Sequence, residues 1–318
     1  MPVDITAGHA MSTYTAVGQK EDVSDIISNI TPMDTPYLSS LGSYPIKSRN
    51  PEWQEDDIRV GATNAKVEGA EYTVSTRTPT VMRGNYTQIM SDAIMIPETV
   101  DVVDKYGRAK ESAYQLVKTG KALKKDLEHA LIGVAQNATV GSSSVARIMG
   151  NILGNAVGGT AMMLQSQAVN STTAGVGDGT AAFVEDDIMA AMFKAYNAGV
   201  TPKVLMVPPK YAMTFAGWAS AAGKYVNKRD ITDDKKITMV IEILVTPYGT
   251  VKVVLNRNMV AQTGLLYDPE YHKLATLRGW KKEPLAKTGD NEKWGLVGEF
   301  TFIHKNFNEG VKLTGLPA

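Results

Sequence analysis

Histidine is the first residue type in this chain that could bind a metal ion or take part in catalysis. The four histidines, His9, His129, His272 and His304, are far apart in the sequence. None belongs to a His-Glu-x-x-His or Cys/His pattern of the kind that binds zinc. His129 falls late in a predicted helix, and we interpret it as an ordinary surface or core residue. The histidines therefore predict neither a metal site nor a catalytic centre.

The glycine-rich and acidic stretches do not match a known site either. GVGDG at 175–179 does not follow a strand and open a helix with dinucleotide-binding spacing, and Gly120-Lys121 lacks the other residues of a phosphate-binding loop. No GxSxG nucleophile elbow is present. The acidic run at 185–187 fits the positive end of a helix, and DNE at 290–292 fits a turn better than a calcium loop. We expect no catalytic residue, no cofactor and no metal ion.

The overall composition is that of an ordinary soluble protein. The chain has 318 residues, 43% hydrophobic and 21% charged, which allows two or three lobes. Its 33 basic residues balance 33 acidic ones, which argues against a dedicated nucleic-acid binder and leaves little self-repulsion between copies. The absence of cysteine excludes disulfides. No membrane span or secretory signal is evident, so we expect a cytoplasmic protein without a membrane partner.

The element that must organise the chain is a long helix predicted at 106–137. No proline interrupts this stretch, and most of its residues are good helix formers. At 1.5 Å per residue the helix would be about 45 Å long, more than a compact core needs. Apolar residues recur along it at three- and four-residue steps, which is typical of one apolar stripe. They are Ala113, Leu116, Val117, Gly120, Leu123, Leu127, Ala130, Leu131 and Val134.

Another face of this predicted helix is basic and carries Lys118, Lys121 and Lys125. One interpretation is a solvated face whose lysines pair with Asp126 and Glu128 of the same helix. The other is a contact with acidic groups of an adjacent subunit. The sequence leaves both open.

The N-terminal arm, residues 1–45, ends in the proline-rich segment TPMDTPYLSSLGSYP. The prolines argue against a regular helix and favour extended backbone. The segment nevertheless carries large apolar side chains, which a free linker would not need. We therefore expect it to lie across another surface, either of its own chain or of a neighbour. These side chains are Met33, Tyr37, Leu38, Leu41 and Tyr44.

Residues 46–90 are polar and rich in Thr, Glu and Gly, with an alternating run at 71–81. Such alternation predicts solvent-exposed strands, here the two strands of a long projecting loop. The stretch has few large apolar residues with which to build its own core. An isolated hairpin is only marginally stable in water, so the loop should rest on a partner.

The second half of the chain predicts a loose connection followed by a compact lobe. Gly, Ala, Ser and Thr dominate 141–182, as in flexible or irregular connections. The late strands are expected to cover the long helix, with which they would form a discontinuous lobe. The predicted elements are helices at 184–198 and 210–219, strands at 203–207, 239–245 and 250–255, and late strands at 265–267, 273–278, 292–305 and 309–313, the last as a candidate partner of 292–305.

Several long stretches, in this order, resemble the major capsid proteins of tailed bacteriophages, which have the Hong Kong 97-type fold. Together they span most of the chain, although 141–182 contributes nothing to the resemblance. The stretches are EDVSDIISNITPMDTPYLSSLG (21–42), the block from Trp53 to Glu68-Gly69, NYTQI (85–89), DKYGRAKESAYQLVKTGKALKKDLEHALIG (104–133), VLMVPPK (204–210), VLNRNM (254–259) and LAKTGDNEKWGLVGEFTF (285–302).

The resemblance implies an α+β fold with five parts. They are an N-terminal arm (1–45), an extended loop (46–90), a peripheral domain (91–145 and 261–318) with spine helix 106–137, a loose connection (146–183) and an axial domain (184–260). It also implies residues that contact neighbouring subunits. We expect these to be Met33, Tyr37, Leu38, Leu41, Tyr44, Trp53, Glu68, Lys118, Lys121 and Lys125.

The function that the resemblance implies is structural, not enzymatic. Copies of the chain would form pentamers and hexamers of an icosahedral shell around double-stranded DNA, which they contact without sequence specificity. The protein would be assembled in the host cytoplasm and belong to the virion. A separate scaffolding protein is expected, because no long charged helical prefix precedes the arm, along with a portal and, as a further candidate, a decoration protein.

Two alternatives share some of these features. An encapsulin-like compartment shell has the same fold but encloses an enzyme instead of a genome. A soluble α/β enzyme with an unrecognised site would require a polar pocket with strongly shifted ionisable groups.

Overall fold

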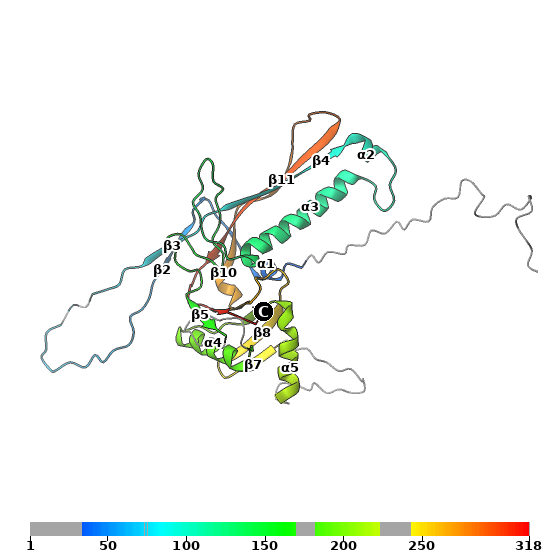
Figure 1. The fold of residues 1–318 in the computed structure, drawn as a ribbon. Helices are drawn as coiled ribbons and strands as arrows, with labels where there is room; N and C mark the ends of the chain where they lie inside the picture. Colours follow the sequence, from blue (N-terminus) through cyan, green and yellow to red (C-terminus); the bar gives the residue numbers. More distant parts are fainter. Residues whose placement is uncertain (1–33, 73, 75, 170–181, 223–242, 318) are drawn as a thin grey trace, which may run out of the picture.

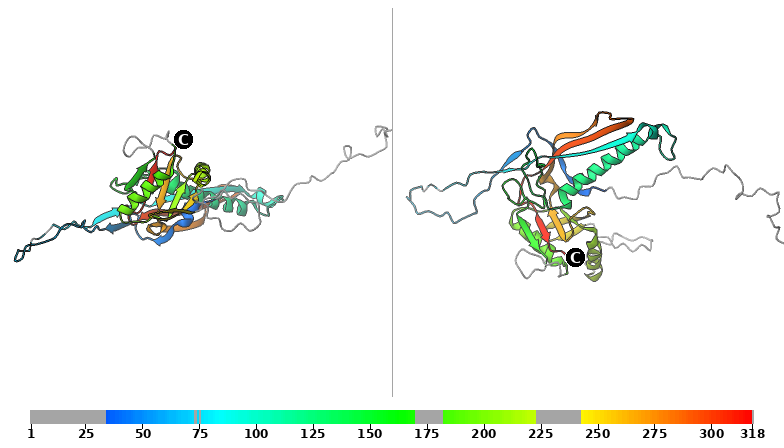
Figure 2. Two further views of the ribbon diagram at one scale, coloured as in Figure 1. Left: turned by 90° about the horizontal axis from the view of Figure 1, so that it is seen from below. Right: turned by 45° about the horizontal axis from the view of Figure 1, so that its top comes forward.

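A computed structural model describes residues 34–72, 74, 76–169, 182–222 and 243–317. Figure 1 shows a long helix lying beside one sheet, a second lobe below it, and a two-stranded ribbon that leads into a loop far from the body. Figure 2 shows the same loop projecting from the body in two further views. Met33 and the rest of residues 1–33 lie outside the described residues.

The upper sheet has four strands in the order β1-β10-β11-β4. β10 and β11 form a long antiparallel hairpin, β4 is antiparallel to β11, and β1 is parallel to β10. The predicted strand at 292–305 is thereby confirmed. The bounds are β1 Gly42–Pro45, β4 Gln88–Pro97, β10 His272–Pro284 and β11 Asn291–His304, with the short helix α2 at Glu98–Val102.

The long helix α3, Glu111–Glu128, runs beside this sheet and begins later than residue 106. Gly107 has a φ of 72°, a left-handed conformation that an α-helix cannot include. Asp101 Oδ1 accepts hydrogen bonds from the backbone N–H groups of Glu111 (2.8 Å) and Ser112 (3.1 Å). These are amides of the first turn, which have no partner within the helix. The cap comes from outside the helix and fixes its start.

The helix also ends earlier than residue 137. After α3 one π-helical turn, His129–Gly133, completes the rod, which is about 34 Å long at 1.5 Å per residue. The buried Asn151 side chain donates hydrogen bonds to the carbonyl oxygens of Ala130 (2.8 Å) and Val134 (2.5 Å). These carbonyl groups need a partner because the helix stops there.

Only the C-terminal half of the predicted apolar stripe is core. Leu123, Leu127 and Leu131 are buried, whereas Val117 is 58% exposed. The body buries the C-terminal end of the rod, whereas the N-terminal half lies beside β4 and α2 and is partly exposed (Figure 1). None of the helices in the described part of the chain is long and apolar enough to cross a bilayer.

The lower sheet has six strands in the order β5-β12-β9-β6-β8-β7. The helices and strands predicted between 184 and 255 are found there, except 239–242, which lie outside the described residues. The strands are β5 Gln165–Ala168, β6 Val204–Val207, β7 Ile243–Thr246, β8 Gly249–Leu255, β9 Thr263–Tyr267 and β12 Val311–Thr314, with helices α4 Glu185–Asn197 and α5 Ala212–Ala222 and 3₁₀ turns η2 Pro209–Tyr211 and η3 Pro269–Tyr271.

The prediction that all late strands cover the long helix is wrong for β9 and β12. β9 pairs with β6 and β12, and β12 pairs with β5, so both belong to the lower sheet. Every residue of β9 is buried. A strand that is buried on both faces needs cover on both sides, and the lower lobe provides it.

The prediction of a loose connection is also wrong for 141–169. This segment is irregular, as expected, but Met149, Ile152 and Met162 are fully buried. The buried Asn85 side chain donates to the carbonyl oxygens of Gly150 (2.8 Å) and Phe302 (2.7 Å). Internal hydrogen bonds therefore replace the solvent that a loop of this composition usually needs. Residues 170–181 lie outside the described part.

The structure also corrects two predictions, one about the projecting loop and one about the N-terminal arm. The loop has strands only at its base, β2 Glu52–Glu55 and β3 Val81–Gly84, and no strand among the described residues from 56 to 80. The arm contains one helical turn, α1 Pro36–Ser40, although its prolines predicted extended backbone. Pro36 is the first residue of this turn, a position where no backbone N–H is required.

The half-buried stripe of the rod predicts a graded response to substitution. Leu131→Ala should lower the free energy of unfolding by about 2–5 kcal/mol, since Leu131 is fully buried in the core. Val117→Ala is the matched control and should change it by less than about 0.5 kcal/mol. Equilibrium urea unfolding of the unassembled subunit, followed by circular dichroism, measures both. Equal losses in the two variants would contradict this account of the helix.

Candidate functional site

The described part of the N-terminal arm is bound to its own chain. Tyr37 of α1 is fully buried. Its ring centroid lies 5.6 Å from that of Tyr267 and 6.0 Å from that of His272, both in edge-on contacts. The Ser40 hydroxyl lies 3.1 Å from the Tyr267 hydroxyl. The arm is therefore fixed where the two sheets meet.

One carboxylate holds this junction together. Glu128, the last residue of α3, is fully buried. Its Oε1 accepts from the backbone N–H of Tyr37 (3.0 Å) and from Asn256 Nδ2 (2.7 Å), and its Oε2 accepts from the backbone N–H of Leu38 (2.7 Å). The arm, the spine helix and the segment after β8 thus share one acceptor group.

Burial shifts the pKa values of the ionisable groups in this junction. Burial raises the pKa of Glu128, although the hydrogen bonds from Leu38 and Asn256 oppose that rise. Burial is also the main cause that raises the pKa of Tyr37 well above its usual value. These shifts follow from packing, because neither side chain has exposed surface with which to meet a substrate.

The structure changes the expected role of several arm residues. Tyr37 leaves no surface for a neighbouring subunit, so it anchors the arm to its own chain. Leu38, Leu41 and Trp53 are partly buried and pack against the same core cluster. Tyr44 is exposed, and its ring lies 5.7 Å from the Lys305 ammonium. Of these side chains, Tyr44 keeps the most surface for a partner.

The charged residues predicted to contact other subunits lie on the outside. Glu68 of the loop, Lys118 and Lys121 are exposed, and Lys125 is half-buried. Glu128 faces the arm, so the prediction that it pairs with these lysines is wrong. The subunit contacts of Glu68 and the lysines stay predictions.

Large apolar side chains of the projecting loop are exposed to solvent. Ile58, Val60, Val67, Tyr72 and Val74 are each between 82% and 103% exposed. Soluble monomers rarely expose many large apolar groups close together. The loop is thus the surface of this subunit that most needs a partner.

A buried cluster of His272, His304 and Glu309 was not predicted. The two histidines are far apart in the sequence but are directly paired across β10 and β11. Burial lowers the pKa of His272. Burial would raise the pKa of Glu309, but the two histidines next to its carboxylate outweigh it and lower this pKa to about 2. Among the described residues, this is the group that could hold a metal ion. Strand register brings it together, and no sequence motif marks it.

The Glu128 junction yields a test of how the arm is held. Glu128→Ala should leave buried donors of Tyr37, Leu38 and Asn256 without an acceptor, at a cost of about 1–3 kcal/mol for each donor. We expect weaker stability in urea and faster tryptic cleavage after Lys47. Asp126→Ala, an exposed carboxylate of the same helix, is the matched control and should behave as the unaltered protein. An unchanged cleavage rate in Glu128→Ala would refute the clamp.

The chain is similar to known capsid proteins. A family model described as SU10 major capsid protein matches residues 10–317. The major capsid protein of Escherichia phage Phieco32 is 27% identical over 344 residues, covering 95% of this chain and 96% of that protein. The match extends over nearly the whole length of both proteins.

Solved structures share the fold at low sequence identity. A chain of the Cyanophage A-1(L) capsid asymmetric unit superposes with a TM-score of 0.68 at 12% identity, covering 96% of this chain and 99% of that one. A chain of an encapsulin complex from Synechococcus elongatus gives a TM-score of 0.59 at 10% identity, covering 97% of each. At these identities the likeness concerns the fold alone, which is of the Hong Kong 97 type. The chain belongs to the SU10 major capsid protein family, and it is a major capsid protein that forms the virion shell of a tailed bacteriophage.

Proposed function

We propose that the subunit forms pentamers and hexamers in which the loop at 46–90 of one copy lies over the next. The observation that carries this proposal is the exposure of Ile58, Val60 and Tyr72 on a loop that projects from the body (Figure 1). Closed rings of identical subunits give each copy a neighbour in the same relative position. Each loop would then bury its apolar groups on a surface that every subunit also offers.

The proposed parts follow the two sheets. The upper sheet with α3 forms the peripheral domain. The lower sheet with α4 and α5 forms the axial domain near the ring centre, and it includes β9 and β12 in addition to residues 184–260. Tyr44, Glu68 and the lysines of α3 are the proposed contacts between subunits.

We further propose that the shell encloses double-stranded DNA and that the protein has no enzymatic activity. The net charge of zero supports a wall that touches phosphates without binding them tightly. Tyr37 and His272, whose pKa values burial shifts, have no exposed surface, and the exposed Lys203 and Lys287, whose pKa values are raised, are in ion pairs with neighbouring carboxylates. This argues against a catalytic pocket. A separate scaffolding protein, a portal and a decoration protein are the proposed further partners.

The encapsulin-like alternative is tested by what the particle contains. Native particles treated with nuclease and then opened should release double-stranded DNA of one length. Proteomic analysis should find no enzyme at a fixed ratio to the shell protein. A co-purified enzyme at constant stoichiometry, with no protected DNA, would overturn the genome-container proposal. Empty particles from expression of this chain alone serve as the control for DNA bound outside the shell.

Removal of the loop tests the assembly proposal. Replacing 56–80 with Asn-Gly would join Glu55 to Val81 through a two-residue turn that suits a hairpin. The body should keep its melting temperature, because the described part of this loop contributes nothing to either core cluster. Shells and capsomers should be lost in negative-stain images.

A milder variant separates apolar contact from loop length. Ile58→Ser, Val60→Ser and Tyr72→Ser together should weaken assembly, whereas Thr63→Ser with Thr76→Ser in the same loop should not. Light scattering after size-exclusion chromatography gives the assembled fraction. Normal shell yield from the loop-deleted protein would show that the loop is not the contact.

A further inference from the structure

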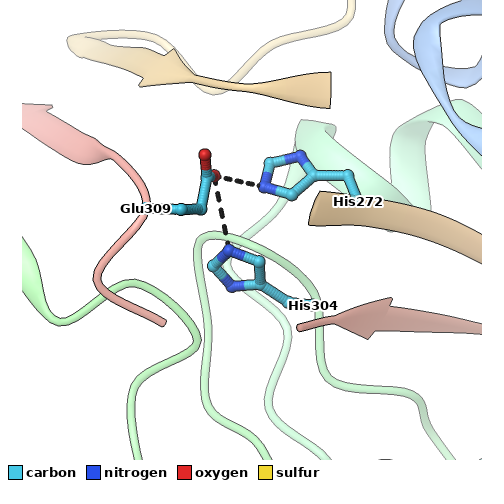
Figure 3. A group of neighbouring side chains, drawn as sticks. All are labelled: His272, His304 and Glu309. Carbon is cyan, nitrogen blue, oxygen red and sulfur yellow. Dashed lines mark ion pairs between the residues drawn. The ribbon is translucent and has the colours of Figure 1, made fainter. Parts of the chain in front are cut away.

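The buried cluster seen above joins parts of the fold that are far apart in the sequence. His272 begins β10, His304 ends β11, and Glu309 lies in the turn that leads to β12 (Figure 3). All three side chains are completely buried. Figure 3 shows the Glu309 carboxylate facing both imidazole rings. The cluster therefore connects the upper sheet to the lower one.

In each of the three side chains, the polar atom that does not face the other two, called here the outer atom, has a hydrogen-bond partner. His304 Nδ1 lies 2.6 Å from the carbonyl oxygen of Met162, which only accepts, so the proton of a neutral ring is on Nδ1. His272 Nδ1 lies 3.2 Å from the Tyr37 hydroxyl. Glu309 Oε2 accepts from the backbone N–H of Asp268 at 2.7 Å. Histidines that bind metals are held in this way, by an outer partner on the other ring nitrogen.

The remaining polar atoms converge on one another as two close contacts (Figure 3). Glu309 Oε1 lies 2.5 Å from His272 Nε2 and 3.3 Å from His304 Nε2. Within the described residues, none of these three atoms makes a hydrogen bond of acceptable geometry. Buried polar atoms without a hydrogen bond need an explanation, and an unseen ion is one.

We propose that His272 Nε2, His304 Nε2 and Glu309 Oε1 bind a divalent transition-metal ion with the chemistry of Zn²⁺. The three ligand atoms lie within 4.8 Å of one another. Imidazole nitrogen is a preferred donor for zinc, while magnesium and calcium prefer oxygen. The chain has no cysteine, so nitrogen and oxygen are its available strong donors.

The spacing of the ligands is close to what zinc requires. Ligand atoms about 2.1 Å from a tetrahedral ion are about 3.4 Å apart. The distance between His304 and Glu309 already matches, and the distance between His272 and Glu309 would open by less than about 1 Å. The three side chains are fully buried, and three protein ligands leave the fourth tetrahedral position to another donor, such as a water molecule. Through the hydroxyl of Tyr37, the ion would also support the arm.

The first experiment measures zinc in the unaltered, untagged protein. Protein is prepared in two ways, by growth in zinc-supplemented medium and by refolding with ZnCl₂, and is then desalted. Elemental analysis should find about one zinc ion per chain, and the melting temperature should exceed that of protein refolded without metal. X-ray absorption at the zinc edge should show two imidazole ligands. Absence of zinc from both preparations, or a bound zinc without imidazole ligands, overturns the proposal.

Variants then assign the site. His304→Gln and Glu309→Gln should lose the stoichiometric zinc. His129→Gln, which alters an exposed histidine, is the matched control and should retain it. Tyr37→Phe keeps the buried ring but removes the outer partner of His272, and should weaken zinc binding about 10-fold. A folded His304→Gln protein with full zinc content overturns the assignment. If this variant does not fold, the absorption spectrum of the unaltered protein decides.

Discussion

The burial of Glu128 is the interaction on which the architecture of this subunit depends. A carboxylate without solvent must have donors, and here they come from the arm and from Asn256 after β8. These donors bind only if the arm, the spine helix and the lower lobe are all in place. The helix end is fixed a second time by Asn151, from a segment that is irregular but packed. Polar groups inside the body thus determine how the apolar parts fit together.

Outside this junction, the subunit has extensions that its own body does not cover. The loop from 56 to 80 exposes its apolar side chains, and the N-terminal half of α3 exposes Val117. A monomer gains nothing from such surface, whereas a shell of identical subunits can bury it at every position. Rigidity at the junction and incompleteness at the extensions are both useful to a capsid protein, because a fixed body can hold its extensions in the same place in every copy.

Much of the fold could be predicted because its signals are local. The periodicity of α3, the helix at 185–197 and the strands around 204–207 and 249–255 depend on side chains a few residues apart. The predictions were wrong where contacts between residues far apart in the sequence determine the structure. Gly107 and Asp101 set the start of α3. Buried pairing placed β9 and β12 in the lower sheet. Internal hydrogen bonds made a Gly- and Ser-rich segment part of the core.

The sequence by itself determined the family, the long helix, the loop and the absence of a local catalytic motif, because ordered stretches of residues carry this information. Only the tertiary structure decided that Tyr37 is an anchor within its own chain and that His272, His304 and Glu309 meet. The physical reason is that burial and strand register are properties of the packed molecule. A side chain has the same chemistry in the sequence whether it faces solvent, a neighbouring subunit or another histidine across a strand pair.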